Sequence, residues 1–197
     1  MLTEKRLNKF KNVISRRQKY FTLVLENIHD AHNVSAIFRT AECAGIDMVY
    51  LVYNTSEFPR ISKTSSASAN KWIEVKRFNN VKDCFLELRK QKYKIYSTHI
   101  PENKTCISYS LYDIDYTKKI ALVFGNEHSG VSDEAINFSD KNLVIPMFGM
   151  VQSLNVSVSA AICIYEGVRQ RMLKGMYDKT FYTGKELNEK LKKYLSK

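Results

Sequence analysis

The stretch MVQSLNVSVSAAICIYE, at residues 150–166, places polar side chains at the start of an otherwise apolar helical pattern. Gln152, Ser153 and Asn155 lie where the chain enters this pattern, and apolar residues follow at helical spacing from Leu154 onward. Ser and Asn side chains often cap a helix by accepting hydrogen bonds from its free backbone N–H groups. Because one cap accounts for only one of the three polar residues, the surplus indicates a binding or catalytic site.

A second polar stretch, ENIHDAHN, precedes a helix that the spacing predicts over residues 33–44. Asn33 stands at its start and Arg39 nearly two turns further on. As ordinary surface groups, Asn33 would cap the helix and Arg39 would pair with Glu42. An Arg on a helix that directly follows a strand is also well placed to hold a phosphate group.

A third polar stretch, FGNEHSG at residues 124–130, directly follows a predicted strand. Its two glycines bracket Glu127, so a tight turn would expose a carboxylate there. The stretch lacks the Lys and Ser/Thr of a P-loop and the G-x-G-x-x-G of dinucleotide-binding folds. An ordinary strand-to-helix loop, with Ser132 capping the next helix, is the alternative interpretation.

Short β-type runs and helical patterns alternate along the chain and must position these stretches. Strands are predicted at residues 22–28, 48–54, 72–78, 94–100, 120–125 and 142–147, with helices at 33–44, 80–91 and 133–138. This alternation, with several continuous apolar runs, predicts a three-layer α/β domain with a mostly parallel sheet. Ligands bind such sheets beyond the carboxyl ends of the strands, which is where the polar stretches lie.

The two ends of the chain carry most of its net charge of +11. Seven of the first 20 residues are Lys or Arg, as are nine of the last 30, and helices are predicted at 3–19 and 185–195. We expect a basic N-terminal helix at 1–20, a central domain at 21–175 and a basic C-terminal tail at 176–197. Two basic ends around a neutral body favour a nucleic-acid partner over a merely solvated surface.

The helix predicted at 154–173 is apolar around most of its circumference. Leu154, Val158 and Ile162 lie on one side, and Val156 and Ala160 lie on the other. A helix of this kind must be covered on both sides. A second subunit could supply the second cover.

Composition excludes several other classes of protein. A chain of 197 residues with 44% apolar residues, 7 Gly and 3 Pro is typical of a single globular domain. Its amino terminus is too charged for a secretory signal, and no apolar run is long enough to span a membrane. The four cysteines lack the C-x-x-C spacing of metal sites. We therefore expect a cytoplasmic protein with reduced thiols and no bound metal or membrane.

Three motifs, in this order along the chain, resemble the signature motifs of the SPOUT superfamily of methyltransferases: NVSAIFR, FGNEHSG and IPMFGMVQSLNVSVSAA. They are most similar to those of the TrmH-type tRNA ribose 2′-O-methyltransferases, and the resemblance covers about residues 16 to 178. It implies an α/β domain with a deep C-terminal trefoil knot, a homodimer, and S-adenosylmethionine bound in the knot.

The resemblance also implies roles for individual residues. It places Asn33, Arg39, Glu127, Ser153 and Asn155 in the active site, and Thr98, Gly125, Ile145 and Leu154 around the cofactor. It implies RNA contacts for Arg16, Arg17, His32, Arg169 and Arg171. The implied reaction moves the methyl group of S-adenosylmethionine to the ribose 2′-hydroxyl of a tRNA nucleotide, the D-loop guanosine in this subfamily. Arg39 would hold the phosphate and the ribose oxygen, because a guanidinium stays protonated near neutral pH.

Two other functions remain open at this point. One is ribose methylation of rRNA or of the tRNA anticodon loop, and the other is RNA binding without catalysis. The rRNA enzymes that resemble this chain carry an added N-terminal RNA-binding domain, whereas about 20 residues precede the first strand here. The anticodon-loop enzymes have little beyond the core. The two basic ends therefore favour the D-loop enzyme, and retention of Arg39 and of the third motif favours catalysis.

Overall fold

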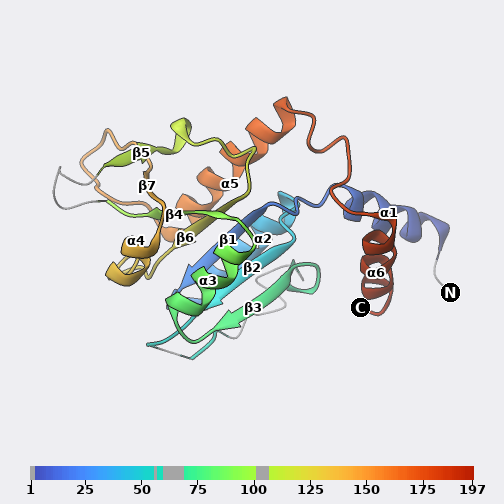
Figure 1. The fold of residues 1–197 in the computed structure, drawn as a ribbon, viewed down its shortest axis with the longest axis horizontal. Coiled ribbons are helices and arrows are strands. Elements are labelled where there is room, and N and C mark those ends of the chain that lie inside the picture. The colour runs from blue at the N-terminus through green and yellow to red at the C-terminus, as the bar shows by residue number, and fades with distance from the viewer. Residues whose placement is uncertain (1–2, 56, 60–68, 101–106) are drawn as a thin grey trace.

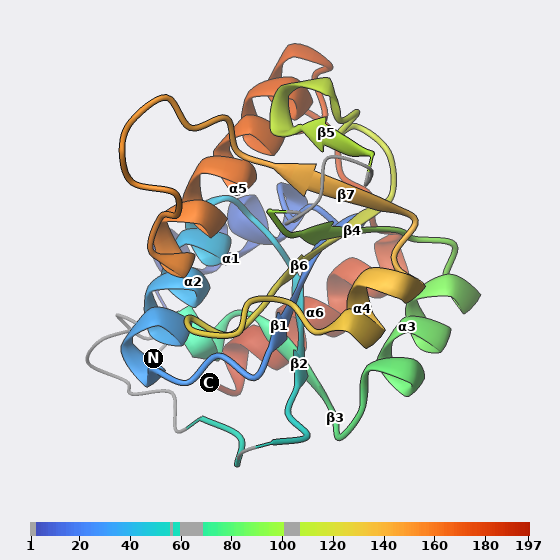
Figure 2. The same ribbon diagram turned by 90° about the vertical axis from the view of Figure 1, so that its left-hand side faces the viewer.

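The computed structural model describes residues 3–55, 57–59, 69–100 and 107–197. The centre of this described part is a parallel sheet of seven strands in the order β3-β2-β1-β6-β4-β7-β5 (Figures 1 and 2). The strands are β1 (Phe21–Glu26), β2 (Met48–Val52), β3 (Glu74–Phe78), β4 (Lys94–Thr98), β5 (Ser108–Ser110), β6 (Ile120–Phe124) and β7 (Lys141–Val144). The helices are α1 (Glu4–Ser15), α2 (Ala31–Cys43), α3 (Val81–Lys90), α4 (Asp133–Phe138), α5 (Val156–Leu173) and α6 (Gly184–Leu195).

Helices cover both faces of the sheet, which confirms the predicted α/β class. On one face, α2 and α5 pack in a core that includes Leu23 and Leu122, and on the other α3 and α4 pack near Val24 and Val123. Successive residues of a strand point to opposite faces, so every residue of β1 is buried. This double burial explains the continuous apolar runs in the sequence.

All six predicted strands are present, although several end earlier than the sequence predicts. β1 stops at Glu26 because Asn27, with φ of 48°, turns the chain out of the sheet. The seventh strand, β5, was not predicted. Its three residues, Ser-Tyr-Ser, are too few and too polar to produce a recognisable strand pattern.

Helices α1 and α6 pack against each other beside the amino-terminal ends of the strands, and both chain ends lie there (Figure 1). Phe10, Ile14 and Tyr194 form their buried contact. The prediction that the first helix reaches residue 19 is wrong, because α1 ends at Ser15. The chain leaves the helix there so that the backbone N–H of Gln18 can donate to the carbonyl of Gly45 over 2.7 Å.

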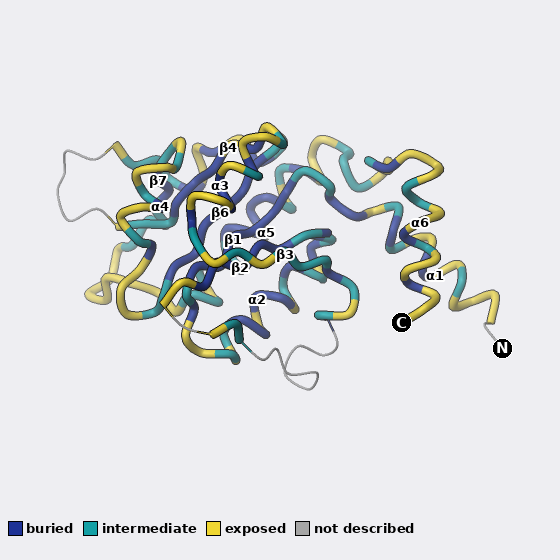
Figure 3. The backbone as a smooth tube through the Cα atoms, turned by 60° about the horizontal axis from the view of Figure 1, so that its bottom comes forward, coloured by how far each residue is buried: buried dark blue, intermediate teal, exposed yellow. Residues whose placement is uncertain are grey.

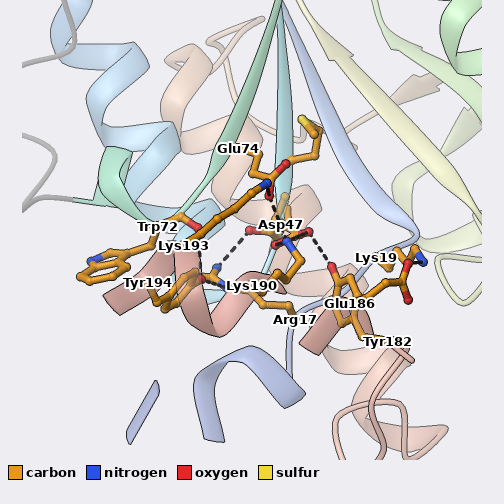
Figure 4. A network of polar contacts seen from close by, with 12 residues as sticks. Arg17, Lys19, Asp47, Trp72, Glu74, Tyr182, Glu186, Lys190, Lys193 and Tyr194 are labelled. Atoms are coloured by element: carbon orange, nitrogen blue, oxygen red, sulfur yellow. Dashed lines mark hydrogen bonds and ion pairs between the residues drawn. The ribbon is translucent and has the colours of Figure 1, made fainter. Parts of the chain in front are cut away.

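A buried ionic network fixes α6 to the starts of β2 and β3 (Figure 4). The ammonium of Lys190 donates to Asp47 Oδ1 over 2.8 Å and to Glu74 Oε1 over 3.2 Å. The Tyr182 hydroxyl donates to the other oxygen of Asp47 over 2.5 Å. Because an unpaired buried charge is strongly destabilising, this network ties the position of α6 to the sheet.

Burial follows the layers of the domain. The strands are mostly buried, whereas α1 and α6 expose most of their outer surfaces (Figure 3). Within the described residues, every helix is too short or too polar to cross a bilayer.

Candidate active site

A pocket of about 430 Å³ lies beyond the carboxyl ends of β4, β6 and β7. Its walls include all four residues that the sequence analysis placed around a cofactor, together with three of the predicted active-site residues. These seven residues are Thr98, Gly125, Ile145, Leu154, Glu127, Ser153 and Asn155. The fold thus brings together residues from three segments that are far apart in the sequence.

The turn after β6 can form only with glycine at its first position. The backbone N–H and carbonyl of Asn126 exchange hydrogen bonds of 2.9 Å with Gly130. A Cβ atom at Gly125 would lie 2.1 Å from the carbonyl oxygen of Gly130, and Gly130 itself has φ of 70°. Both glycines are therefore required by the backbone, and the turn between them presents Glu127 to the pocket.

The side chain of Asn126 holds this turn in place. Its amide donates to the carbonyl of Asn27 over 2.7 Å and accepts from the backbone N–H groups of His128 and Ser129 at 2.8 and 3.2 Å. Beside it, the buried carboxylate of Glu26 accepts from the backbone and hydroxyl of Ser132 at 3.1 and 2.5 Å. The end of β1 thus fixes the loop that carries Glu127.

Glu127 is surrounded by hydrogen-bond donors. Its carboxylate accepts from Asn33 Nδ2 at 2.8 Å and from the backbone N–H groups of His29 and Asp30 at 2.8 and 3.1 Å. Burial alone would raise the pKa of Glu127, but the hydrogen bonds from Asn33, His29 and Asp30 outweigh it and hold the pKa below its usual value. The group is therefore an ionised anchor at neutral pH, and a weak base.

Asn155 connects this carboxylate to the third motif. Its side-chain oxygen caps α5 by accepting from the backbone N–H of Ser157 at 2.8 Å, and its amide donates to Asn33 Oδ1 over 3.1 Å. Asn155, Asn33 and Glu127 thus form one hydrogen-bonded chain. The single cap among the polar residues 152–155 is Asn155, while Ser153 lines the pocket.

In the second polar stretch, Asn33 does not cap α2 and Arg39 does not pair with Glu42, so both of these simpler interpretations are wrong. Asp30, not Asn33, caps α2, and it accepts from the backbone N–H of His32 at 2.8 Å. Because α2 starts two residues earlier than predicted, Asn33 is free to reach Glu127. Glu42 pairs with Arg17 over 2.9 Å and not with Arg39.

Arg39 is exposed on α2 and is not among the residues that line the pocket. It lies six residues beyond Asn33, a rise of about 9 Å along the helix. The structure therefore joins Asn33, Glu127 and Asn155 directly, whereas the Arg39 side chain is open to solvent further along α2.

Two of the five arginine and histidine positions predicted to contact RNA are wholly buried. The Arg171 side chain donates to the carbonyls of Tyr116, Tyr20 and Lys118 and to Gln18 Oε1, all within 3.0 Å. Loss of solvation lowers its pKa to about 10. The prediction of an RNA contact is wrong for Arg171, because its guanidinium is used to join the start of β1 to the chain before β6.

The predicted RNA contact is also wrong for Arg17, because this side chain is buried as well. Its guanidinium contacts Glu42, the carbonyl of Ile46 and the hydroxyl of Tyr194, and it has no exposed surface. The sequence shows that a residue is charged but not whether neighbouring carbonyls and carboxylates surround it, so it does not distinguish these two buried arginines from exposed ones. Arg16, His32 and Arg169 are exposed, and Arg169 makes two 2.8 Å hydrogen bonds to Glu166.

Asn126 and Glu26 also belong to the site, although the sequence alone does not single them out. Asn126 lies within the FGNEHSG motif and could have been suspected from its place between two glycines. Glu26 is an acid that ends an apolar strand, and this is a weaker signal. The backbone N–H groups of His29 and Asp30 also contact Glu127, and no side-chain type in the sequence indicates such backbone donors.

Comparison with known proteins agrees with this arrangement. The chain matches the SpoU rRNA Methylase family over residues 20–165. It is 36% identical over 194 residues to the tRNA (guanosine(18)-2′-O)-methyltransferase of Aquifex aeolicus strain VF5, an alignment that covers 98% of this chain and 90% of that protein.

Solved structures of RNA methyltransferases also match the fold of this chain. The crystal structure of the A. aeolicus TrmH/SpoU tRNA modifying enzyme matches with a TM-score of 0.90 and 36% identity, over 98% of this chain and 96% of that one. The AdoMet-bound rRNA methyltransferase of Sinorhizobium meliloti matches with a TM-score of 0.68 and 25% identity, over 81% of this chain and 59% of that one. The family match includes the segments that carry Asn33, Glu127 and Asn155, and the chain belongs to the SpoU methylase family.

Proposed function

We propose that this protein transfers a methyl group from S-adenosylmethionine to the ribose 2′-oxygen of a tRNA nucleotide, the D-loop guanosine. The observation that carries this proposal is the hydrogen-bonded chain Asn155–Asn33–Glu127 at the edge of the 430 Å³ pocket. It links the three motif segments at one place. The relative from A. aeolicus, which is named for this reaction, aligns over nearly the whole chain.

The pocket residues fit S-adenosylmethionine, which when bound supplies an electrophilic methyl group on a sulfonium. Leu143, Ile145 and Leu154 give apolar walls, and the turn at Gly125 gives close access to the backbone. Thr98 Oγ1 donates to the carbonyl of Val123 over 2.7 Å, so its lone pairs are left to accept a hydrogen bond from a ligand. A volume of about 430 Å³ is in the range of roughly 300–1,000 Å³ typical of small-molecule sites.

The remaining residues would position the ribose hydroxyl and its phosphate. We assign the orientation of these groups to Asn33, Glu127, Ser153 and Asn155, and the binding of phosphate and ribose oxygen to Arg39. Glu127 is a poor general base because its pKa is lowered. We therefore propose that the ribose proton passes to solvent water late in the reaction, as the oxygen–methyl bond forms and the methyl–sulfur bond breaks.

We also propose a homodimer with α5 and the preceding loop in its interface. Phe148 and Met150 are each 98% exposed, and Val151, Val158 and Tyr165 add further exposed apolar surface. A patch of this kind favours burial against another chain. The deep trefoil knot through this region remains a proposal, supported by the family membership and by the crossed strand order β6-β4-β7-β5.

Ribose methylation of rRNA is the main alternative. Against it, the fold of the tRNA modifying enzyme from A. aeolicus matches with a TM-score of 0.90, compared with 0.68 for the rRNA methyltransferase from S. meliloti. We propose that the exposed Arg16, His32 and Arg169 contact the tRNA, with the basic segments 1–20 and 176–197 as added binding elements, and that the protein works in the cytoplasm.

A comparison of substrates tests this proposal. Purified protein and labelled S-adenosylmethionine are incubated with a tRNA transcript, an anticodon stem-loop and an rRNA fragment. We expect rapid methyl incorporation into the full tRNA alone. Faster incorporation into the rRNA fragment or the anticodon stem-loop would replace the proposed substrate.

A further inference from the structure

A groove of about 510 Å³ separates α1 from α6 on the outer side of their contact. A second hollow of about 280 Å³ continues from it toward the turn after α5. The two share Asn12 and Ser15, so they are adjacent, and together they are here called the terminal groove. Its lining includes Asn12, Leu187, Asn188 and Leu191 between the helices, and Arg16 and Lys179 at its far end.

The lining of the terminal groove changes in character along its length. The floor between the helices is apolar, from Ile14, Leu187 and Leu191, and exposed amides of Asn12 and Asn188 stand at its rim. At the far end the cations Arg16 and Lys179 face the second hollow, with Asp178 as its acidic neighbour. An apolar floor with amide groups suits the face and edge of a nucleobase, and cations suit a phosphate.

The terminal groove is far from the candidate active site. Only residues 16–20 separate the end of α1 from the amino-terminal end of β1, whereas the pocket lies beyond the carboxyl ends of the strands. The six residues of β1, at about 3.3 Å per residue, separate the amino-terminal ends of the strands from their carboxyl-terminal ends by roughly 20 Å. Figure 1 shows α1 and α6 at one end of the molecule and β5, β7 and α4 at the other.

The groove is formed in advance of binding. Its α6 wall is fixed by the contacts of Lys190 with Asp47 and Glu74, and by the Arg17 guanidinium, which donates to the Tyr194 hydroxyl over 3.1 Å (Figure 4). A capping box between Thr183 and Glu186 fixes the start of the same helix. A preformed groove reduces the ordering cost of binding.

We propose that the terminal groove holds one unstacked nucleotide of the RNA substrate, with its base over Leu187 and Leu191 and its phosphate at Arg16. This inference rests on the proposed function and adds a second nucleotide site beside the amino-terminal ends of the strands. A polyanion is favoured over a protein helix by charge, because α1 also exposes Lys5, Arg6, Lys9 and Lys11. The apolar floor is only three residues wide, and a protein helix would cover the rim amides without pairing them.

Binding of a tRNA transcript to groove variants tests the inference. Asn12→Ala/Asn188→Ala removes the rim amides while raising helix propensity, so folding is preserved. We expect this double variant to weaken tRNA affinity by about fivefold or more. Arg16→Ala should flatten the salt dependence of binding, by about 0.7 to 0.9 in the slope of log affinity against log salt.

Matched controls remove an exposed amide and an exposed cation elsewhere. Asn137→Ala on α4 and Lys82→Ala on α3 should leave tRNA affinity unchanged. A transcript carrying 4-thiouridine should crosslink to α1 or α6 peptides, and Asn12→Ala/Asn188→Ala should reduce that crosslink. Unchanged affinity, slope and crosslinks in all groove variants would overturn the inference while leaving the methyltransferase proposal in place. If the groove variants change the oligomeric state while tRNA affinity stays the same, the groove binds protein and the inference is wrong. Failure of the unmodified chain to bind tRNA would overturn both proposals.

Discussion

The amide of Asn155 donates to Asn33 Oδ1 over 3.1 Å, although the two residues are 122 positions apart in the chain. Asn33 in turn contacts Glu127, because its side-chain Nδ2 donates to the Glu127 carboxylate over 2.8 Å. The helix cap of α5, the first turn of α2 and the turn after β6 are thereby fixed relative to one another. A ribose held by these groups would meet a prearranged set of hydrogen-bond partners, which is the condition for efficient catalysis by positioning.

Replacement of Asn33 by Asp should separate this positioning role from folding. The variant keeps the shape of the side chain and can still accept from Asn155, but it places a second carboxylate against Glu127. We expect turnover with saturating tRNA to fall on the order of 10²-fold, as for loss of one positioned donor. Single-turnover methyl transfer measures this, with the exposed Asn137→Asp as control. Near-normal turnover in Asn33→Asp would show that the contact is not needed for catalysis.

The Glu127 carboxylate should make stability depend on pH in a defined direction. Its pKa in the folded protein is lowered below the ordinary 4.5, so its contribution to stability is complete above pH 4.5 and is lost as the pH falls through the lowered value. The difference in unfolding free energy between wild type and Glu127→Gln should therefore shrink below pH 4.5. Urea unfolding at several pH values measures it. A difference that grows on acidification would contradict the sign of the shift.

Gly125→Ala should damage the pocket more than the fold. The added Cβ would lie 2.1 Å from the carbonyl of Gly130, and the turn must open to admit it. We expect affinity for S-adenosylmethionine, measured by calorimetry, to fall by about tenfold or more, the equivalent of roughly 1.4 kcal/mol. Gly184→Ala is the matched control, because nothing lies within 4 Å of a Cβ there. Equal cofactor affinity in both variants would mean that the turn does not form the cofactor wall.

Arg171 and Arg169 should behave differently although both belong to the sequence VRQR. Arg171→Met leaves the carbonyls of Tyr20, Tyr116 and Lys118 without their donor, and we expect a loss of about 3 kcal/mol or more in the free energy of unfolding. Arg169→Ala should change stability little and should weaken tRNA binding. Denaturant unfolding and tRNA titration distinguish the two. Full stability in Arg171→Met would show that the buried guanidinium is dispensable.

Arg39→Lys tests the assignment of phosphate and ribose binding to the exposed arginine of α2. Lysine keeps the charge but lacks the paired N–H groups that bind an oxyanion in two places. We expect turnover at saturating tRNA to fall by about tenfold or more, with cofactor affinity unchanged. Steady-state kinetics with tRNA measure the effect, and Arg77→Lys on β3 serves as control. Normal kinetics in Arg39→Lys would remove the bidentate role.

The sequence was informative where residue type alone determines the outcome. Double burial of β1 requires the apolar run FTLVLE, and the turn at Gly125 requires glycine, so both could be predicted. The surplus of polar residues at 152–155 indicates a site there, but it is the resemblance of the motifs to those of SPOUT methyltransferases that places Asn33 and Asn155 in it. β5 was missed because three residues pair in the sheet through backbone groups that any sequence offers.

Burial of charge could not be predicted in the same way. Arg17 and Arg171 look like their exposed neighbours Arg16 and Arg169 in the sequence, and only the fold surrounds them with acceptors. The start of α2 was also misplaced, because Asp30 and Asn33 are both good caps and the choice depends on Glu127, which lies far away in the chain. Long-range contacts, not local propensity, decided each of these positions.

In the proposed mechanism, the Asn155–Asn33–Glu127 chain positions one ribose of tRNA for methyl transfer. Its most direct test is to treat a tRNA transcript with the protein and S-adenosylmethionine, digest the product, and locate the methyl group by mass spectrometry. The mechanism requires a single 2′-O-methylguanosine in the D-loop with wild-type protein, and only a trace of it with Asn33→Asp. A methyl group on a base, or on a ribose outside the D-loop, or equal modification by Asn33→Asp, would contradict it.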